Sequence, residues 1–147
     1  MNGAARDTPV DENRRLVRRY FEEVLNAGRL ELADTLLAPD VVFQNPPVIA
    51  RGPKEFKDAI AAVRAAFPDL RFAIEDEIAA ADKIVTRWRV TGTQTGTFFG
   101  RAASGRRIDV SGMNIFRIAD GVIREIWVNM DRLGELIQLG WVDAGAI

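Results

Sequence analysis

Polar and titratable side chains gather at one end of an alternating segment near residue 130. Trp127, Asn129 and Asp131 are spaced two residues apart, which in a β-strand places them on one face. A carboxylate beside an indole and aliphatic neighbours is desolvated, and desolvation raises its pKa toward the range useful for proton transfer. Asp131 is therefore a candidate for proton transfer, and Asn129 on the same face could orient a water or a carbonyl. Asp131 could instead cap a helix that begins just after it.

The chain contains neither histidine nor cysteine. Disulfides, thiol nucleophiles and Ser–His–Asp chemistry are therefore excluded, and a zinc site would have to consist of carboxylates alone. Proton transfer near neutral pH must use a carboxylate with a raised pKa, a tyrosine, a lysine or water. We accordingly expect no metal ligands and no cofactor.

Composition and charge indicate one ordinary globular domain. Of the 147 residues, 48% are hydrophobic and 28% are charged, and the net charge is −1. This balance lacks the basic surplus that nucleic-acid binding needs. No apolar run is long enough to span a bilayer, and the polar N-terminus lacks the apolar core of a signal peptide. We therefore expect a cytoplasmic protein without a membrane partner, with a flexible tail over residues 1–10 and a single domain over 11–147.

Helical patterns come first in the chain and strand patterns follow. Helices are predicted over residues 11–27, 30–37, 53–67 and 133–139, and a short strand over 41–45. Longer strands are predicted over 70–79, 83–94, 107–118 and 122–130, separated by turn signals. This order predicts an α+β fold in which the later strands form an antiparallel meander.

The last strand also predicts an assembly. Its second face carries Val122, Ile126, Val128 and Met130, and its only charged residue is Arg124. A sheet that is packed by helices on one face and remains apolar on the other usually pairs with another surface. We therefore predict a homodimer formed through this face.

An ordered set of short motifs resembles the SnoaL-like polyketide cyclases over residues 11–140. The C-terminal motif consists of Asp120-Gly121-Val122-Ile123, Trp127, Asp131, Leu133-Gly134 and Gln138-Leu139-Gly140. The upstream motifs are Phe67-Pro68-Asp69-Leu70, Gly92-Thr93-Gln94-Thr95-Gly96 and Gly105-Arg106. The resemblance implies the cone-shaped α+β fold of the nuclear-transport-factor-2-like superfamily, in which a curved antiparallel sheet wraps around the N-terminal helices and encloses an apolar pocket. It also implies that Asp131 serves as general acid and base while a polyketide-type substrate closes a ring by aldol condensation, without a metal.

The N-terminal half is similar to the ketosteroid isomerases of the same superfamily. Arg19-Tyr20, followed by residues 25–28, resembles the helix that carries their oxyanion tyrosine, which would be Tyr20. Their catalytic base is an aspartate before a proline, and Asn45 stands at that place here. An amide cannot accept a proton near neutral pH, which argues against an isomerase of that kind. Tyr20 could also be a core residue, and Asn45 an edge amide that satisfies the backbone.

Arg87 and Arg89 flank Trp88 and must share a face of their strand. In epoxide hydrolases of this fold an arginine–aspartate pair occupies this strand, and here Arg89 replaces the acid. The two arginines could clamp an acidic substrate or lie on a solvated outer face. Apolar pocket walls are expected from Phe43, Trp88 and Met113, and residues 93–100 are expected to form a lid because glycines flank its aromatics.

The leading hypothesis is a cofactor-free polyketide cyclase that acts on a hydrophobic small molecule. Its predicted site comprises Asp131 for catalysis, with Asn129, Trp127, Asn45, Phe43, Tyr20, Trp88, Met113 and Arg87 for substrate binding. The alternatives are a non-catalytic small-molecule binding or accessory protein on the same scaffold, or a relative of the epoxide hydrolases or isomerases.

Overall fold

The N-terminal helix begins at Pro9 in the computed structural model, which describes residues 9–146. Helix α1 (Pro9–Arg19) continues directly into η1 (Tyr20–Asn26), which has π-helical hydrogen bonding. Their apolar side chains share one stripe, so that Val17, Tyr20 and Phe21 are fully buried. Pro9 and Val10 belong to α1 rather than to the predicted tail, and the rest of that tail lies outside the described residues.

Two short helical turns and one longer helix complete the N-terminal half. They are η2 (Leu30–Leu32), α2 (Ala33–Leu36) and α3 (Gly52–Ala66). Pro53 stands in the first turn of α3, where its missing N–H breaks no hydrogen bond. Phe56 and Ile60 point from α3 into the core, as their helical spacing predicts.

The sheet has six strands in the order β2-β1-β6-β5-β4-β3. The strands are β1 (Leu37–Asn45), β2 (Val48–Arg51), β3 (Arg71–Ala80), β4 (Lys83–Thr93), β5 (Arg107–Ala119) and β6 (Val122–Met130). The pairs β3–β4, β4–β5 and β5–β6 are antiparallel, as predicted. The β1–β2 pair is also antiparallel, whereas β1 and β6 run parallel. Strand β2 is not predicted, because two consecutive prolines after Asn45 indicate only the end of a strand. In the structure Pro46 and Pro47 form the turn of a hairpin that joins β1 to β2.

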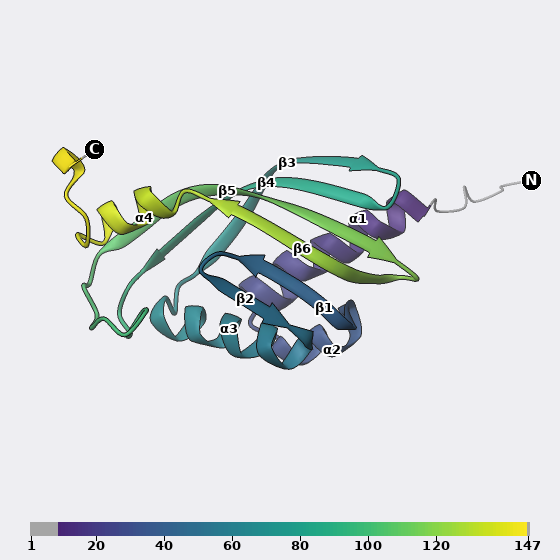
Figure 1. The fold of residues 1–147 in the computed structure, drawn as a ribbon, viewed down its shortest axis with the longest axis horizontal. Helices are drawn as coiled ribbons and strands as arrows, with labels where there is room; N and C mark the ends of the chain where they lie inside the picture. The colour runs from purple at the N-terminus through teal and green to yellow at the C-terminus, as the bar shows by residue number, and fades with distance from the viewer. Residues whose placement is uncertain (1–8, 147) are drawn as a thin grey trace, which may run out of the picture.

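The sheet curves over the helices, with α1 and α3 beneath its concave face (Figure 1). Helix α4 (Arg132–Gln138) follows β6 at the far end of the sheet, and η3 (Ala144–Ala146) lies near the C-terminus. The predicted α+β fold, with a curved sheet around the N-terminal helices, is confirmed. No helix among residues 9–146 has the length and apolar character required to cross a membrane.

An irregularity in β6 reverses the face assignment made from its sequence. Arg117 pairs with Glu125 but Ile118 pairs with Ile123, so Arg124 is an extra residue in the ladder. Ile123 and Ile126 therefore both face the core, together with Val128. The face predicted to form the dimer interface is thus buried inside the same chain, and that part of the prediction was wrong.

Candidate functional site

A cavity of about 220 Å³ lies between the helices and the concave face of the sheet. It is larger than the roughly 150 Å³ apolar cavity that accommodates benzene in an engineered protein. Its walls come from η1, α3, several strands and the loop of residues 94–106, and most of the lining side chains are apolar. Four of the predicted site residues line it, namely Tyr20, Phe43, Asn45 and Trp88.

Trp88 and Asn114 provide a polar contact inside the apolar wall. The indole Nε1 of Trp88 donates to Oδ1 of Asn114 at 3.0 Å, and both side chains are buried. Gly112 makes this arrangement possible, because a Cβ at this position would lie 2.5 Å from the indole ring. The amide nitrogen of Asn114 has no protein partner among the described residues, so it can donate to a ligand oxygen.

Tyr20 is both a core residue and a residue of the cavity wall. Its ring packs against Phe21, Phe56 and Phe116 at centroid distances of 5.2, 5.7 and 5.1 Å, so it belongs to the core. It also lines the cavity, and its hydroxyl makes no hydrogen bond within the described part of the chain. Burial raises the pKa of Tyr20 strongly, which keeps the hydroxyl protonated. Tyr20 can therefore act as a donor to a bound molecule.

Three polar residues at the junction of β1 and α4 form what we call the Arg132 cluster: Asn45, Arg132 and Glu135. Nη1 of Arg132 donates to Oε1 of Glu135 at 2.8 Å, and Nη2 donates to Oδ1 of Asn45 at 3.3 Å. The guanidinium also lies over the ring of Phe99, with its carbon 5.6 Å from the ring centroid. All three members of the cluster line the cavity, so they give it one charged end.

Glu135 is the carboxylate that lines this cavity among the described residues. Only 3% of its surface is exposed, and burial raises the pKa of its carboxyl, an effect that the charge of Arg132 opposes. The negative charge of Asp131 adds to the rise in the Glu135 pKa. Sequence reasoning missed both Arg132 and Glu135, because α4 was interpreted as a leucine-rich stripe beginning at Leu133. Their opposite charges, three residues apart behind Asp131, are the signal that could have revealed them.

Asp131 is the N-cap of α4. Its Oδ1 accepts a hydrogen bond from the backbone N–H of Gly134 at 2.8 Å, as the capping interpretation predicts. The side chain is exposed and is not among the residues that line the cavity. It stands one helical turn before Glu135, close enough to influence the pKa of that carboxyl. Its acid–base role stays a prediction.

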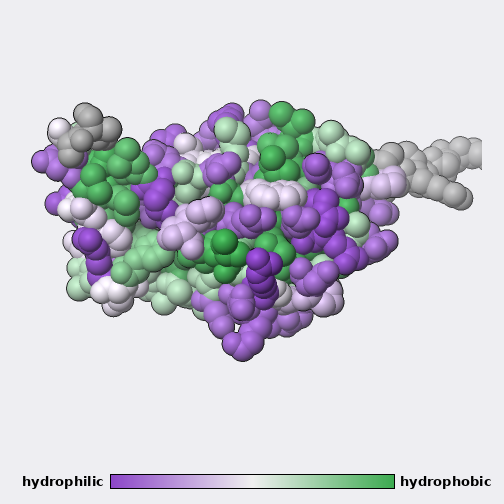
Figure 2. Space-filling view, viewed as in Figure 1, coloured by the Kyte–Doolittle hydropathy of each residue, from purple (hydrophilic) through white to green (hydrophobic). Residues whose placement is uncertain are grey.

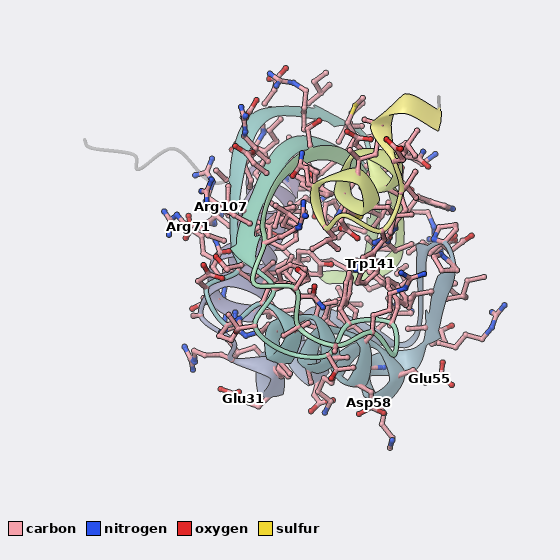
Figure 3. All side chains as sticks on the ribbon, turned by 90° about the vertical axis from the view of Figure 1, so that its left-hand side faces the viewer. Glu31, Glu55, Asp58, Arg71, Arg107 and Trp141 are labelled. Atoms are coloured by element: carbon pink, nitrogen blue, oxygen red, sulfur yellow. The ribbon has the colours of Figure 1, made fainter. Side chains whose placement is uncertain are left out.

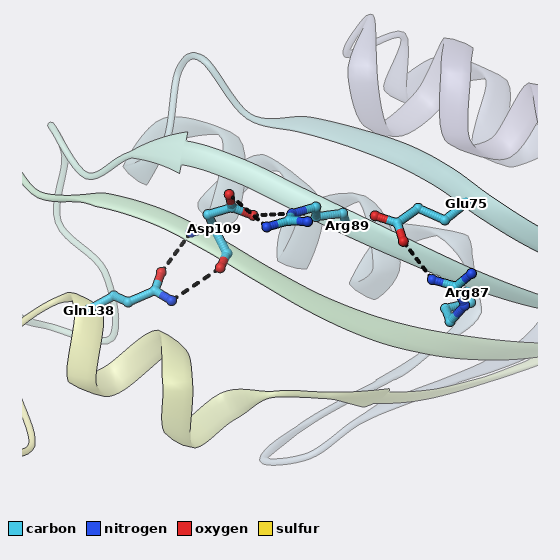
Figure 4. A network of polar contacts seen from close by, with 5 residues as sticks. All are labelled: Glu75, Arg87, Arg89, Asp109 and Gln138. Carbon is cyan, nitrogen blue, oxygen red and sulfur yellow. Dashed lines mark hydrogen bonds and ion pairs between the residues drawn. The ribbon is translucent and has the colours of Figure 1, made fainter. Parts of the chain in front are cut away.

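The other predicted site residues lie on the outer, convex face of the sheet, away from the cavity. Met113 pairs with Asn129 across β5 and β6, Arg87 is opposite Met113, and Trp127 lies two residues from Asn129 on the same face. Arg87 forms an ion pair with Glu75 (Figure 4). The extra residue in β6 is the reason why Trp127 and Asn129 turn outward while Val128 and Met130 line the cavity.

Arg89 also points outward and forms two hydrogen bonds with Asp109 (Figure 4). The hydrogen bond from Arg89 lowers the pKa of the Asp109 carboxyl. The two arginines therefore have acidic neighbours on the outer face, in agreement with the interpretation of a solvated surface rather than a clamp inside the pocket.

The loop predicted to be a lid contributes to the cavity wall. Thr97, Phe98 and Phe99 line the cavity, and Phe98 packs on Phe67 at a centroid distance of 5.0 Å. Gln94 is fully buried and its side chain makes three hydrogen bonds to loop backbone. In the view from the end of the molecule that carries α4, the sheet arches over α3, and Trp141 lies between them (Figure 3).

Comparisons with known proteins identify relatives over nearly the whole chain. The family model of the SnoaL-like polyketide cyclases matches residues 15–139. The chain is 30% identical to the aklanonic acid methyl ester cyclase DnrD of Streptomyces peucetius, over 90% of this chain and 91% of that one. It is 31% identical to the nogalonic acid methyl ester cyclase of Streptomyces nogalater, over 80% and 92%. The structure of TsrD from Streptomyces laurentii superposes with a TM-score of 0.83 at 32% identity, covering 92% of this chain and 100% of that one.

Proposed function

The chain belongs to the SnoaL-like polyketide cyclase family, and from this membership we propose that it closes a ring within a polyketide-type substrate. The observation that carries the proposal is the apolar cavity with donors in its wall and a charged cluster at one end. Such a cavity suits a flat, hydrophobic molecule that carries several carbonyl oxygens. Two relatives are named as cyclases of methyl esters, so an ester of this type is the substrate class to test first.

The proposed reaction is an intramolecular aldol addition. A carboxylate removes a proton from a methylene between two carbonyls, and the resulting enolate carbon attacks a ketone carbon of the same molecule. The new alkoxide then takes a proton, so that protons are exchanged but none is consumed. Tyr20 and Asn114 are placed in the cavity wall, where their donors can stabilise the oxygen that gains negative charge. The substrate carries its own acidic hydrogens, so we propose that the reaction needs no cofactor.

Asp131 is our candidate for the acid–base group. Asp131 lies within the part of the chain that matches the family, and the resemblance of the segment around it to the cyclases supports this role. It also lies one helical turn from a carboxylate in the cavity wall. Glu135 is a second candidate because it lines the cavity and burial raises its pKa, which makes its carboxylate a stronger base. Asn45 accepts a hydrogen bond from Arg132, and its amide cannot act as a base near neutral pH. The catalytic base of the ketosteroid isomerases therefore has no counterpart at this position.

The first experiment is a ring-closure assay with the wild-type protein. Aklanonic acid methyl ester and nogalonic acid methyl ester are each incubated with the protein in the presence of EDTA, and cyclised product is followed by chromatography. We expect turnover above the uncatalysed rate, undiminished by EDTA. A protein that binds either ester without cyclising it would support the alternative of a binding protein. Activity that EDTA abolishes and one divalent ion restores would contradict the cofactor-free reaction.

We further propose that the protein works as a homodimer in the cytoplasm. The support for the dimer is an outer sheet face with exposed apolar side chains, among them Ile78, Met113 and Ile115. Figure 2 shows that hydrophobic groups reach the surface among hydrophilic ones on one side of the molecule.

A further inference from the structure

Arg132 has more hydrogen-bond donors than its protein neighbours can use. A guanidinium carries five N–H groups, of which one donates to Glu135 and one to Asn45. The bond to Asn45 is long, at 3.3 Å, and Nε is buried without a partner in the described part of the chain. A buried unpaired donor is unfavourable unless another molecule supplies the acceptor.

The poorly solvated surroundings of Arg132 should strengthen a hydrogen bond from its guanidinium to a ligand oxygen. Phe99 covers one face of the guanidinium, and most of the cavity beyond it is apolar. In such a poorly solvated site, a hydrogen bond between a cation and an anionic oxygen is stronger than the same bond in water. Glu135 supplies the single negative charge in the cavity wall among the described residues, and it is itself desolvated.

We propose that Arg132 binds a carboxylate at one end of an otherwise hydrophobic ring-bearing ligand. The planar guanidinium can hold both oxygens of a carboxylate, whereas a methyl ester offers a neutral carbonyl and no charge. This assignment rests on the proposed function only in taking the cavity as the substrate site. It predicts that the protein binds a free acid more tightly than the methyl ester of that acid. The two curated relatives, in contrast, are named as cyclases of methyl esters.

Replacing Glu135 should have the opposite effect on ligand binding to replacing Arg132. Its carboxylate shares the guanidinium with the ligand, since Nη1 of Arg132 is bound to its Oε1. Replacing Glu135 by glutamine keeps the side-chain shape and removes the competing negative charge. An anionic ligand should then bind more tightly, while a neutral ligand should be almost unaffected.

The test uses two probes with the same ring system, anionic 2-naphthoate and its neutral methyl ester, titrated at pH 7 by calorimetry. For the wild type we expect 2-naphthoate to bind about tenfold more tightly than the ester, or more. Arg132→Gln should abolish this preference, and Glu135→Gln should enlarge it. The double variant Arg132→Gln/Glu135→Gln leaves no unpaired buried charge and should fold normally with no preference.

Equal affinity of the wild type for the two probes would overturn the proposal. So would an acid preference that survives in the double variant, or a Glu135→Gln protein that binds 2-naphthoate more weakly. Because the titration needs no turnover, its failure is separate from failure of the ring-closure assay. A protein that cyclises a methyl ester but shows no acid preference would retain the proposed function and lose the carboxylate site.

Discussion

At the scale of single residues, Glu135 carries a charge that its surroundings disfavour. Burial raises the pKa of its carboxyl above the ordinary value of 4.5, and Arg132 offsets this only in part. The folded protein therefore holds this proton more tightly than the unfolded chain does. Between the unfolded and the folded pKa, the folded state binds more protons, so the free energy of unfolding falls as pH rises through that window.

This leads to a pH-dependent difference between the wild type and Glu135→Gln. As pH rises from about 4.5, the melting temperature of the wild type should fall relative to that of the variant, and the difference should level off above the folded pKa. All other titrating groups are shared, so subtraction isolates Glu135, and Arg132 remains charged throughout. Thermal melts of both proteins between pH 4 and 8 provide the measurement. Parallel curves, or a slope of opposite sign, would contradict the assignment.

Residue types and their spacing in the sequence predict part of the cavity wall. Phe43 and Trp88 are large apolar residues at inward strand positions, and Tyr20 stands on the buried stripe of a helix, so periodicity alone points them inward. Arg132 and Glu135 could not be found in this way. A charged residue in the first turn of a short helix is normally solvated, and only the fold of the chain against β1 buries this pair.

At the scale of elements, the position of α4 decides the shape of the charged end of the cavity. Gln138 ties this helix to β5, since its Oε1 accepts from the backbone N–H of Asp109 at 2.7 Å (Figure 4). Its Nε2 donates to the backbone carbonyl of the same residue at 3.1 Å. The side-chain amide of Gln138 thus pairs with the backbone N–H and C=O of Asp109, which a neighbouring strand would otherwise bind, because β6 does not extend that far.

Gln138→Ala should therefore leave two backbone groups of Asp109 without their partner. We expect a loss of about 1–3 kcal/mol in the free energy of unfolding. We also expect weaker binding of the naphthalene probes, because α4 carries Arg132 and Glu135. Gln138→Glu is the matched control, since it keeps an acceptor for the N–H and should lose less. Urea denaturation of the three proteins measures the difference, and an unchanged midpoint in Gln138→Ala would exclude this role.

The order of the elements could be predicted from periodicity, but the face of β6 could not. Strict alternation from Ile123 to Met130 assumes that each residue has one partner, and the extra residue Arg124 breaks that assumption. A shift of one position exchanges the two faces of a strand. The irregularity lies between Arg117 and Ile118 of the neighbouring strand, so it depends on a pairing that the sequence of β6 alone does not contain.

At the scale of the whole molecule, the outer sheet face carries a row of apolar side chains across four strands. Ile78, Val85, Ile115 and Trp127 are paired in register from β3 to β6. Ile78 is 60% exposed and Ile115 is 39% exposed, which is unfavourable in water for a contiguous row. This row, rather than the buried residues of β6, is the surface we now propose for the homodimer.

Ile115→Glu places a charge in the middle of that row and should convert the dimer to a monomer. Light scattering at micromolar concentration should give about twice 16.3 kDa for the wild type and 16.3 kDa for the variant. Leu133→Glu is the control, because Leu133 is 45% exposed on α4, outside the row. That variant should remain dimeric. A wild type that scatters as a 16.3 kDa particle would rule out the dimer at this concentration.

In the proposed reaction, a carboxylate at or near the start of α4 moves the protons of ring closure. Turnover of Asp131→Asn and Glu135→Gln in the ring-closure assay tests it most directly, with folding checked by thermal melts. Asparagine still caps α4, so Asp131→Asn should fold, whereas Asp131→Ala should lose about 0.5–2 kcal/mol of stability. We predict that one of the two isosteric variants loses about two to four orders of magnitude in kcat, which identifies the acid–base group. Wild-type kcat in both folded variants would show that neither carboxylate is the acid–base group.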